Sequence, residues 1–379
     1  MIGGEEFIAA AAAAGFAFWS GVPCSLVGSL IDAATDHPDL TYVGATNEGE
    51  ATALAVGAWL AGVHGGVITQ NSGLGNIVNP LTSLAAPAAV PLLIVCGWRG
   101  APGHADEPQH ALMGQITPAL LTLLGVDRRE VPADAASLEA ELRMAGEWMI
   151  ETGRSQAFLA APGTFGRADA DRPRPASPAA RPGRVEGVEA LPFATRGEVL
   201  ETVLAELPAD SAVVATTGHT ARELFALHDS PSHYYHVGAM GSAAGTGLGL
   251  ALNSDRKVVV LDGDGSALMR LGTMATAGHL RPANFVQVLL DNGAHASTGG
   301  QPTASPSVDF AAVAAACGFP SAIRVEDHGH LADALATALA EDGPHLLHVP
   351  LLPGTSAGLG RPTLTPAEVA LRFRDFVVA

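Results

Sequence analysis

Lysine is almost absent from this sequence of 379 residues, because Lys257 is its only lysine and the other Lys/Arg positions are all arginine. Lysine forms the Schiff base in many covalent mechanisms and contacts phosphate in the common nucleotide-binding loops, so both chemistries would depend on Lys257 here. Cysteine is also scarce. Cys24, Cys96 and Cys317 have no metal-binding spacing and would leave one thiol over if two were paired. We expect three buried thiols in a reducing cytoplasm.

Positive charge and long apolar runs are lacking as well. The formal net charge is -18, from 38 acidic and 20 basic residues, so the overall field repels nucleic acid and anionic membranes. No apolar run reaches the roughly 18 residues that span a bilayer. The first residues have no basic segment of the kind that opens a signal peptide. We therefore expect neither a nucleic-acid partner nor a membrane partner, and local groups must hold any anionic ligand.

Short apolar segments rich in β-branched residues alternate with longer Ala/Leu-rich segments, in two successive series. This alternation is typical of parallel sheets with helices on both faces. The sequence predicts an α/β protein of two doubly wound parallel-sheet domains, residues 1–165 and 192–379, joined by a Pro/Arg/Ala-rich linker over residues 166–191. The predicted strands are 16–20, 41–45, 66–70, 91–96 and 156–160 in the first domain, and 212–216, 233–237, 257–261, 285–290, 322–325 and 345–349 in the second.

The strongest motif is LDGDGS at residues 261–266, followed by VLLDNGAH at residues 288–295. Asp264 and Asn292 follow two successive strands, and parallel pairing would bring them to one sheet edge. Carboxylate and amide oxygens suit Mg²⁺, and the oxygens of a diphosphate would complete its coordination. Gly263 and Gly265 allow a tight turn with exposed amides, and we expect Ser266 to cap the following helix. A plain glycine-rich turn between strand and helix is the alternative interpretation.

The GDGS motif, with 28 positions from Asp264 to Asn292, resembles the cofactor motif of the thiamine-diphosphate-dependent decarboxylase superfamily. The resemblance implies a PYR-type first domain and a PP-type second domain, both binding thiamine diphosphate, and Mg²⁺ held by Asp264, Asn292 and the carbonyl of Ala294. It also implies that Glu48 is the acid that exchanges a proton with the cofactor's aminopyrimidine, because a helix glycine, Gly57, follows nine residues later.

Further cofactor contacts follow from the same resemblance. Met240 is expected beneath the cofactor, although a methionine among glycines can also be core filler. The catalytic glutamate lies in the first domain and the metal ligands lie in the second. Members of the superfamily draw these two domains from different subunits, so the resemblance implies a homodimer or a higher oligomer with active sites between subunits. The other expected cofactor-binding residues are Gly218, His219, Thr220, Gly263, Gly265 and Ser266.

Longer stretches resemble a narrower branch, the phosphonopyruvate and sulfopyruvate decarboxylases, which lacks a middle domain. This resemblance implies non-oxidative decarboxylation of 3-phosphonopyruvate to phosphonoacetaldehyde and CO₂, through an ylid and an enamine of thiamine diphosphate, in the biosynthesis of phosphonate natural products, antibiotics among them. The stretches that carry it are residues 21–25, 47–51, 70–84, 98–114 and 291–301.

The substrate of such an enzyme is a polyanion, so we expect local hydrogen-bond donors to bind it. His110 and His295 are expected to move protons or to contact substrate, although an exposed loop histidine is the plainer interpretation of His110. Arg99 could bind phosphonate through two parallel hydrogen bonds, or could form a structural ion pair. The expected substrate residues are Ser25, Gln70, Asn71, Ser72 and Arg99, with Thr298, Gly299 and Gln301 in a closing loop.

Three alternatives stay open at this point. Sulfopyruvate is also a tetrahedral anion attached to a 2-oxo acid, so a 3-sulfopyruvate decarboxylase that gives sulfoacetaldehyde is the nearest alternative. A carboligase would join the same enamine to a second aldehyde. A nucleotide-sensing or scaffold protein would keep the fold without the chemistry, but the joint presence of Glu48, Asp264 and Asn292 argues against this option.

Overall fold

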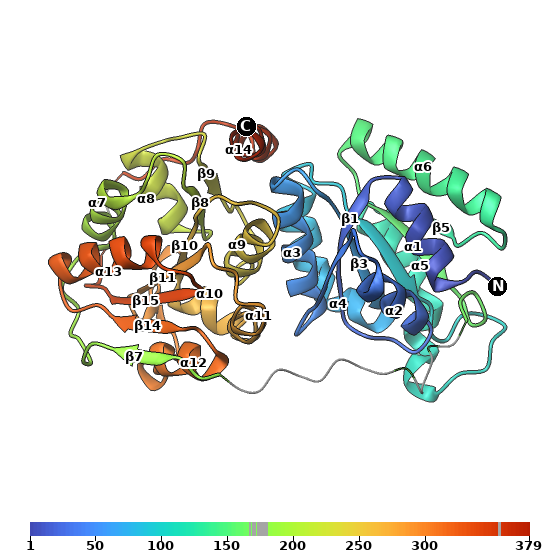
Figure 1. Ribbon diagram of the computed structural model, residues 1–379, viewed down its shortest axis with the longest axis horizontal. Helices are drawn as coiled ribbons and strands as arrows, with labels where there is room; N and C mark the ends of the chain where they lie inside the picture. Colours follow the sequence, from blue (N-terminus) through green and yellow to red (C-terminus); the bar gives the residue numbers. More distant parts are fainter. Residues whose placement is uncertain (167, 169–171, 173–180, 355–357) are drawn as a thin grey trace. The chain divides into compact units, whose positions relative to one another are not determined.

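The structure is a computed structural model that describes residues 1–166, 168, 172, 181–354 and 358–379. The chain divides into two compact units, Met1–Ser177 and Pro178–Ala379, and each unit is an α/β domain (Figure 1). The division falls inside the predicted linker, residues 166–191, much of which lies outside the described residues. The exact domain ends at residues 165 and 192 stay a prediction.

The first unit is built on a six-stranded parallel sheet with strand order β2-β1-β3-β4-β6-β5. Its central strands are largely buried, and every residue of β4 and β6 is buried, as expected for a sheet covered on both faces. Helix α1 packs against α2 and α6, and α3 packs against β1 and β3. The strands are β1 Phe16–Gly21, β2 Thr41–Gly44, β3 His64–Gln70, β4 Leu93–Gly97, β5 Asp127–Glu130 and β6 Gln156–Ala160, and the helices are α1 Gly4–Ala13, α2 Gly28–Asp36, α3 Glu48–Leu60, α4 Leu74–Pro80, α5 Ala111–Leu123 and α6 Ala135–Thr152.

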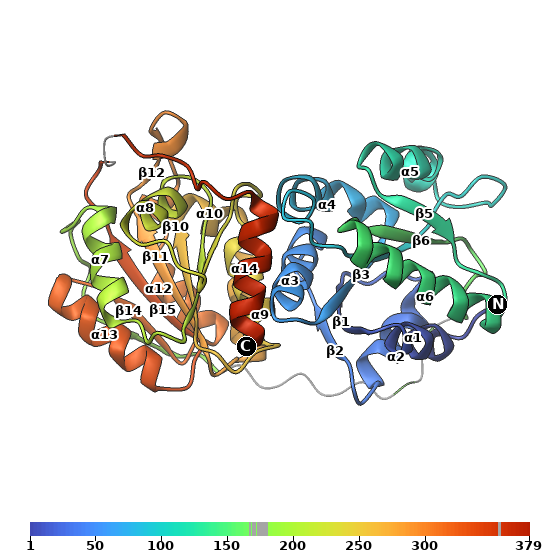
Figure 2. The same cartoon turned by 90° about the horizontal axis from the view of Figure 1, so that it is seen from above.

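The second unit contains a seven-stranded parallel sheet with order β7-β14-β15-β11-β10-β8-β9, and a small antiparallel pair, β12 and β13. Helices α7 and α13 pack together on one side of the large sheet, and α9 lies on the other side (Figure 2). The strands are β7 Arg184–Glu186, β8 Ala212–Ala215, β9 His233–Tyr235, β10 Val258–Gly263, β11 Phe285–Asp291, β12 Ala294–His295, β13 Gln301–Pro302, β14 Ser321–Arg324 and β15 His345–Pro350, and the helices are α7 Arg196–Glu206, α8 His219–Leu227, α9 Ala243–Ala251, α10 Asp264–Met269, α11 Gly272–Leu280, α12 Phe310–Cys317, α13 His328–Ala340 and α14 Pro366–Val378.

The predicted fold class is confirmed, and all eleven predicted strands are present with ends shifted by at most two residues. Two strands of the large sheets were not predicted. Strand β5 has the charged sequence DRRE, and β7, with the sequence RVE, falls inside the range predicted as linker. Both are largely exposed edge strands, so neither needs the apolar pattern by which strands are recognised.

No helix within the described ranges combines the length and the apolar character needed to cross a bilayer.

Candidate active site

The second sheet reverses its winding between β8 and β10. From β8 the chain moves outward to the edge strand β9, whereas from β10 it moves to β11 on the opposite side. In open parallel sheets, ligands bind beyond the carboxyl ends of the strands at such a reversal. Thr216 directly follows β8 and Asp264 directly follows β10. The first sheet reverses in the same way between β1 and β3, so each unit has one favoured edge for a site.

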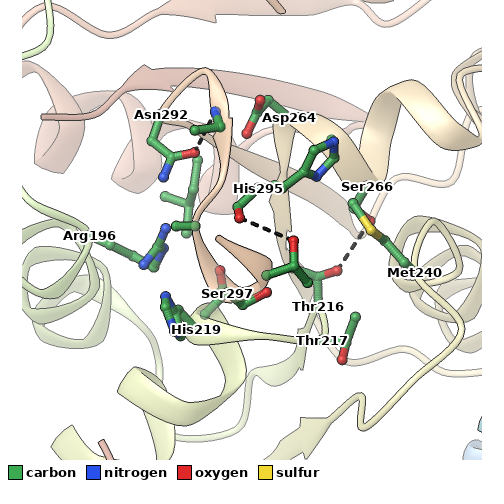
Figure 3. A pocket seen from close by; sticks show the side chains of 17 residues that line it. Arg196, Thr216, Thr217, His219, Met240, Asp264, Ser266, Asn292, His295 and Ser297 are labelled. Carbon is green, nitrogen blue, oxygen red and sulfur yellow. Dashed lines mark hydrogen bonds between the residues drawn. The ribbon is translucent and has the colours of Figure 1, made fainter. Parts of the chain in front are cut away.

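A cavity of about 110 Å³ opens at the reversal in the second unit (Figure 3). It brings together most of the residues that the sequence predicts for the cofactor and the metal. Gly218, Gly299 and Gln301 are not among the residues that line it. The predicted residues that do line it are His219, Thr220, Met240, Gly263, Asp264, Gly265, Ser266, Asn292, Ala294, His295 and Thr298.

Asp264 and Asn292 contribute carboxylate and amide oxygens, which are hard ligands, to the lining of this cavity. They follow β10 and β11, which pair in parallel through Gly263 and Leu290. The Asp264 side chain accepts a hydrogen bond from Thr303 Oγ1, and burial together with the nearby charge of Asp291 raises its pKa. The Asn292 Oδ1 atom accepts from the Ala294 amide at 3.2 Å.

This donor set fits a hard divalent cation bound together with phosphate. One buried carboxylate and one amide oxygen are too few to hold Mg²⁺ alone, and no group of three or more His, Cys, Asp or Glu side chains within the described residues could hold a metal ion. Mg²⁺ is commonly bound through one or two carboxylates and completed by substrate phosphates and water. The edge of the cavity therefore suits a cation that arrives with a diphosphate.

Asp262, in strand β10, directly precedes the lining residue Gly263, and the sequence did not predict a role for it. It is fully buried, accepts from the Gly263 amide at 3.0 Å and from Gln287 Nε2 at 3.2 Å, and burial raises its pKa to about 6. Next to it, Ser266 Oγ accepts from Thr216 Oγ1 and from the Gly241 amide, both at 3.1 Å. The predicted helix cap at Ser266 is wrong: helix α10 begins at Asp264, with Gly263 as its N-cap, so Ser266 lies within the helix and ties β8 and the Met240 loop to it.

The loop that carries Met240 has a constrained backbone. Ala239 on one side has a φ of 50° and Gly241 on the other has a φ of 88°. A non-glycine residue in this left-handed region costs about 1 kcal/mol, and such conformations cluster at functional sites. A Cβ atom at Gly265 would lie 3.0 Å from Met240 Cε and 2.6 Å from His295 Cε1. The bare backbone at Gly265 therefore lets Met240 and His295 approach the same turn.

Arg196 is a lining residue that sequence reasoning missed. It begins helix α7 and does not directly follow a strand, so no motif pointed to it. Its guanidinium Nη1 lies 3.4 Å from Glu223 Oε1, and both side chains are buried. Burial and the positive charge of Arg196 lower the pKa of the neighbouring His219. His219 is therefore neutral at pH 7.

The predicted closing loop forms a small hairpin. Strands β12 and β13 pair antiparallel, with Ala294 opposite Pro302 and His295 opposite Gln301. Its tip residues Gly299 and Gly300 both have positive φ angles, 128° and 76°. Thr298, Gly299 and Gln301 are exposed there, at the end of the hairpin that borders the cavity.

In the first unit, Glu48 is buried at the start of helix α3. The helix begins there because Asn47 caps it: Asn47 Oδ1 accepts from the amides of Gly49 and Glu50, at 2.9 and 3.0 Å. Glu48 Oε2 accepts from Asn76 Nδ2 at 2.7 Å. Its other oxygen packs so closely on Gly73 that a Cβ atom there would lie 2.3 Å from it.

Several predicted substrate residues meet beyond β1, β3 and β4. Arg99 forms a bidentate ion pair with Asp106 and donates from Nη1 to Ser25 Oγ at 3.2 Å. The Asn71 side chain donates to the Arg99 carbonyl at 2.8 Å and to Thr117 Oγ1 at 3.0 Å, and accepts from the Arg99 amide. Asn71 therefore orients the Arg99 backbone, and the structural ion pair considered for Arg99 is present.

The remaining predicted residues of the first unit lie close by along the chain. Gln70 ends β3 and donates from Nε2 to Ser72 Oγ at 2.6 Å. His110 is buried, immediately before helix α5, and its backbone carbonyl approaches Gly100. Each of these residues lies in a loop next to the carboxyl end of a strand or at the helix that follows it.

Comparisons with known proteins identify both units. Residues 1–120 match the model of the thiamine pyrophosphate enzyme N-terminal domain, and residues 215–349 match that of the C-terminal domain; thiamine pyrophosphate is another name for thiamine diphosphate. The benzoylformate decarboxylase of Polynucleobacter necessarius has the same fold, with a TM-score of 0.70 and 14% identity over 94% of this chain and 100% of that one. Fold and site thus define a thiamine pyrophosphate enzyme.

Sequence relatives narrow the class. The phosphonopyruvate decarboxylases of Streptomyces viridochromogenes and Streptomyces hygroscopicus are 49% and 47% identical to this chain, over 100% and 99% of its length and 95% and 94% of theirs. The sulfopyruvate decarboxylase of Methanosarcina acetivorans is 28% identical over 93% of this chain and 92% of its own length. The chain belongs to the phosphonopyruvate decarboxylase family, as the sequence motifs predicted.

Proposed function

We propose that this enzyme decarboxylates 3-phosphonopyruvate to phosphonoacetaldehyde and CO₂, with thiamine diphosphate and Mg²⁺ as cofactors, in phosphonate natural-product biosynthesis. The observation that carries this proposal is the 49% and 47% identity, over nearly the whole chain, to two phosphonopyruvate decarboxylases. All three cysteines are free; Cys24 and Cys96 are buried as expected, whereas Cys317 is only partly buried. Free thiols are compatible with the reducing cytoplasm, where we propose that the enzyme works.

The cofactor site is assigned to the second unit. Asp264, Asn292 and the carbonyl of Ala294 would hold Mg²⁺, because they offer the hard oxygens at the cavity edge. Met240, held between two residues with positive φ, would support the ring system from below. When bound, thiamine diphosphate supplies the electron sink for loss of CO₂. The groups proposed to surround its diphosphate are Gly218, His219, Thr220, Gly263, Gly265 and Ser266.

Glu48 is proposed as the acid that exchanges a proton with the aminopyrimidine. Asn76 holds one of its oxygens and Gly73 leaves space for the other, so the carboxyl group has a fixed direction. Fixed orientation is what makes a general acid effective, since the proton must pass over a single hydrogen bond. His110 and His295 are proposed to move the later proton to the product or to contact the substrate.

The substrate's anionic group is assigned to the first unit's loops and the hairpin. Arg99 uses two of its nitrogens for Asp106, which keeps the plane of the guanidinium fixed while Nη1 points to Ser25. A phosphonate oxygen could replace or share that contact with little reorganisation. Gln70 and Ser72 are further donors, Asn71 acts by orienting Arg99, and Thr298, Gly299 and Gln301 are proposed to close over the bound substrate.

One assay separates the candidate substrates. The purified full chain, with both cofactors, is given 3-phosphonopyruvate or 3-sulfopyruvate, and both CO₂ and the aldehyde product are measured. We expect the kcat/KM for 3-phosphonopyruvate to be at least tenfold higher than that for 3-sulfopyruvate. Preference for sulfopyruvate would overturn the assignment, and a coupled product in place of phosphonoacetaldehyde when an acceptor aldehyde is added would favour a carboligase.

We further propose a homodimer or a higher oligomer in which each active site takes Glu48 from one subunit and Asp264 from another. The superfamily resemblance supports this proposal, and the proposed acid and the proposed metal ligands lie in different compact units, as such an arrangement requires. Homodimers with twofold symmetry are the commonest soluble oligomers.

A further inference from the structure

The position of Arg196 carries two energetic costs. It is the first residue of helix α7, whose start is already closed by a capping box between Thr195 and Glu198. A cation at a helix N-terminus is disfavoured by the helix dipole, by about 0.3–1 kcal/mol at exposed sites. Its side chain is only 8% exposed, so the guanidinium has also lost most of its hydration. A ligand that needs the charge would account for both costs.

The protein leaves the hydrogen-bonding capacity of Arg196 largely unused. Within the described part of the chain its guanidinium makes one hydrogen bond, to Glu223 Oε1 at the long distance of 3.4 Å. A guanidinium carries five N–H donors in a planar fork that matches the oxygens of a carboxylate or a phosphate. A buried charge with so few partners is unfavourable unless further hydrogen bonds complete it.

The charges around Arg196 indicate that it binds an anion. It is the only lysine or arginine among the lining residues of the cavity, and His219 beside it is neutral at pH 7 because of its lowered pKa. The one lysine of the chain, Lys257, is engaged elsewhere, with the carbonyls of Ala283 and Glu341. Among the described residues that line this cavity, Arg196 is therefore the one fixed positive charge.

The position of Arg196 within the cavity indicates which anion. In Figure 3, Arg196 and His219 lie at one end, beside Asn292, and Met240 lies at the other. Met240 marks the end assigned to the ring system, so Arg196 lies at the end farthest from the rings. We propose that Arg196 binds the terminal phosphate of the cofactor diphosphate, and that the hydrogen bond to Glu223 orients its guanidinium. This inference rests on the thiamine enzyme class and not on the choice of substrate.

The test measures cofactor affinity without any turnover. Thiamine diphosphate and thiamine monophosphate, which lacks the terminal phosphate, are titrated into the full chain with Mg²⁺ by calorimetry. We expect Arg196→Ala to raise the Kd of the diphosphate at least tenfold and that of the monophosphate less than threefold. Arg196→Lys, which keeps the charge but not the fork, should lie between wild type and Arg196→Ala. Arg143→Ala, at an exposed position of the first unit, is the matched control.

Two outcomes would overturn the inference. Equal losses for both ligands would mean that Arg196 does not contact the terminal phosphate. An unchanged Kd for the diphosphate with a raised KM for phosphonopyruvate would move Arg196 to the substrate. If Arg196→Ala does not fold, as judged by circular dichroism, the Arg196→Lys affinities decide by the same comparison. Failure of the substrate proposal leaves this result intact, because no substrate is present in the titration.

Discussion

Two buried glutamates stand two residues apart at the start of helix α3, and their contacts differ. Glu50 Oε2 accepts hydrogen bonds from both the amide and the hydroxyl of Thr46. These bonds stabilise the turn that precedes the helix. Glu48 accepts from the side chain of Asn76, across the loop that follows β3. The contacts of Glu50 are local and structural, whereas Glu48 is held by a side chain of helix α4, which is distant in sequence. That difference supports Glu48, and not Glu50, as the carboxyl group that contacts the cofactor.

Replacement of Glu48 by glutamine tests its proposed role. Glu48→Gln keeps the shape and the contact with Asn76 but removes the exchangeable acid, so we expect kcat to fall by about 10²–10⁴-fold. The Kd of thiamine diphosphate, measured by calorimetry, should change less than threefold. Glu50→Gln is the control: it should lower Tm, because the Thr46 donors lose a charged acceptor, while most of the turnover remains. An unchanged rate in Glu48→Gln would remove the assigned role.

Gly73 tests the same acid through its packing. A Cβ atom at this position would lie 2.3 Å from Glu48 Oε1 and 2.5 Å from Thr69 Oγ1, so Gly73→Ala must displace the carboxylate. We expect kcat to fall at least tenfold and the free energy of unfolding to drop by about 1–3 kcal/mol, as in other overpacked sites. Gly75→Ala, in α4 and with nothing within 4 Å, should leave both almost unchanged. Equal kinetics for the two variants would contradict the packing argument.

The site residues that the sequence predicts are those that directly follow a recognisable strand. Asp264 and Asn292 could be paired in advance because each directly follows an apolar strand, and parallel neighbours end at one edge. The positions of Arg196 and Asp262 at the site could not be predicted in this way. Arg196 reaches the cavity from a helix start, and Asp262 is the penultimate residue of β10, where its polar character is explained only by the buried donors around it.

At the scale of elements, burial decided which strands could be predicted. Most of the eleven predicted strands carry apolar runs because they are buried inside the sheets, although the edge strands β2 and β9 are also among them. Strands β5 and β7 lie at sheet edges, where one side faces solvent and charged residues are tolerated, so their sequences contain no signal. The β12–β13 hairpin was predicted only as a loop, because two-residue strands are too short for alternation to be visible.

The segment after β9 makes the second unit sensitive to acid. His236 is fully buried, with its ring edge-on to Tyr234, and burial lowers its pKa from 6.5 to about 4. Since the unfolded chain takes up the proton first, stability is complete above about pH 6.5 and is lost as the pH falls toward 4. The loss is about 3 kcal/mol at most, at about 1.4 kcal/mol per pKa unit.

We therefore expect His236→Gln to flatten the decrease of Tm between pH 6.5 and pH 5, as measured by differential scanning fluorimetry of the full chain. His104→Gln, at an exposed position in the first unit, should leave the decrease as it is in wild type. The same slope in His236→Gln and wild type would show that other groups, such as the buried His233, account for the acid sensitivity.

At the scale of the whole molecule, the sequence predicts two α/β halves, and the two compact units and two separate domain matches agree with it. The net charge of -18 excludes non-specific attraction of anions, so phosphate binding has to be local. The association of the two halves could not be predicted from strand patterns, because these report only on the sheet to which each strand belongs.

A mixing experiment tests whether each site needs two subunits. Glu48→Gln and Asp264→Asn chains, each nearly inactive alone, are unfolded, mixed in equal amounts and refolded together. If sites form between subunits, half of the dimers are mixed, and one of the two sites in each mixed dimer joins an intact Glu48 to an intact Asp264. The mixture should then recover about a quarter of the wild-type kcat. If each chain built its own site, every site would carry one defect and the mixture would stay as inactive as its components. Wild-type chain refolded in the same way sets the yield against which the recovery is scored.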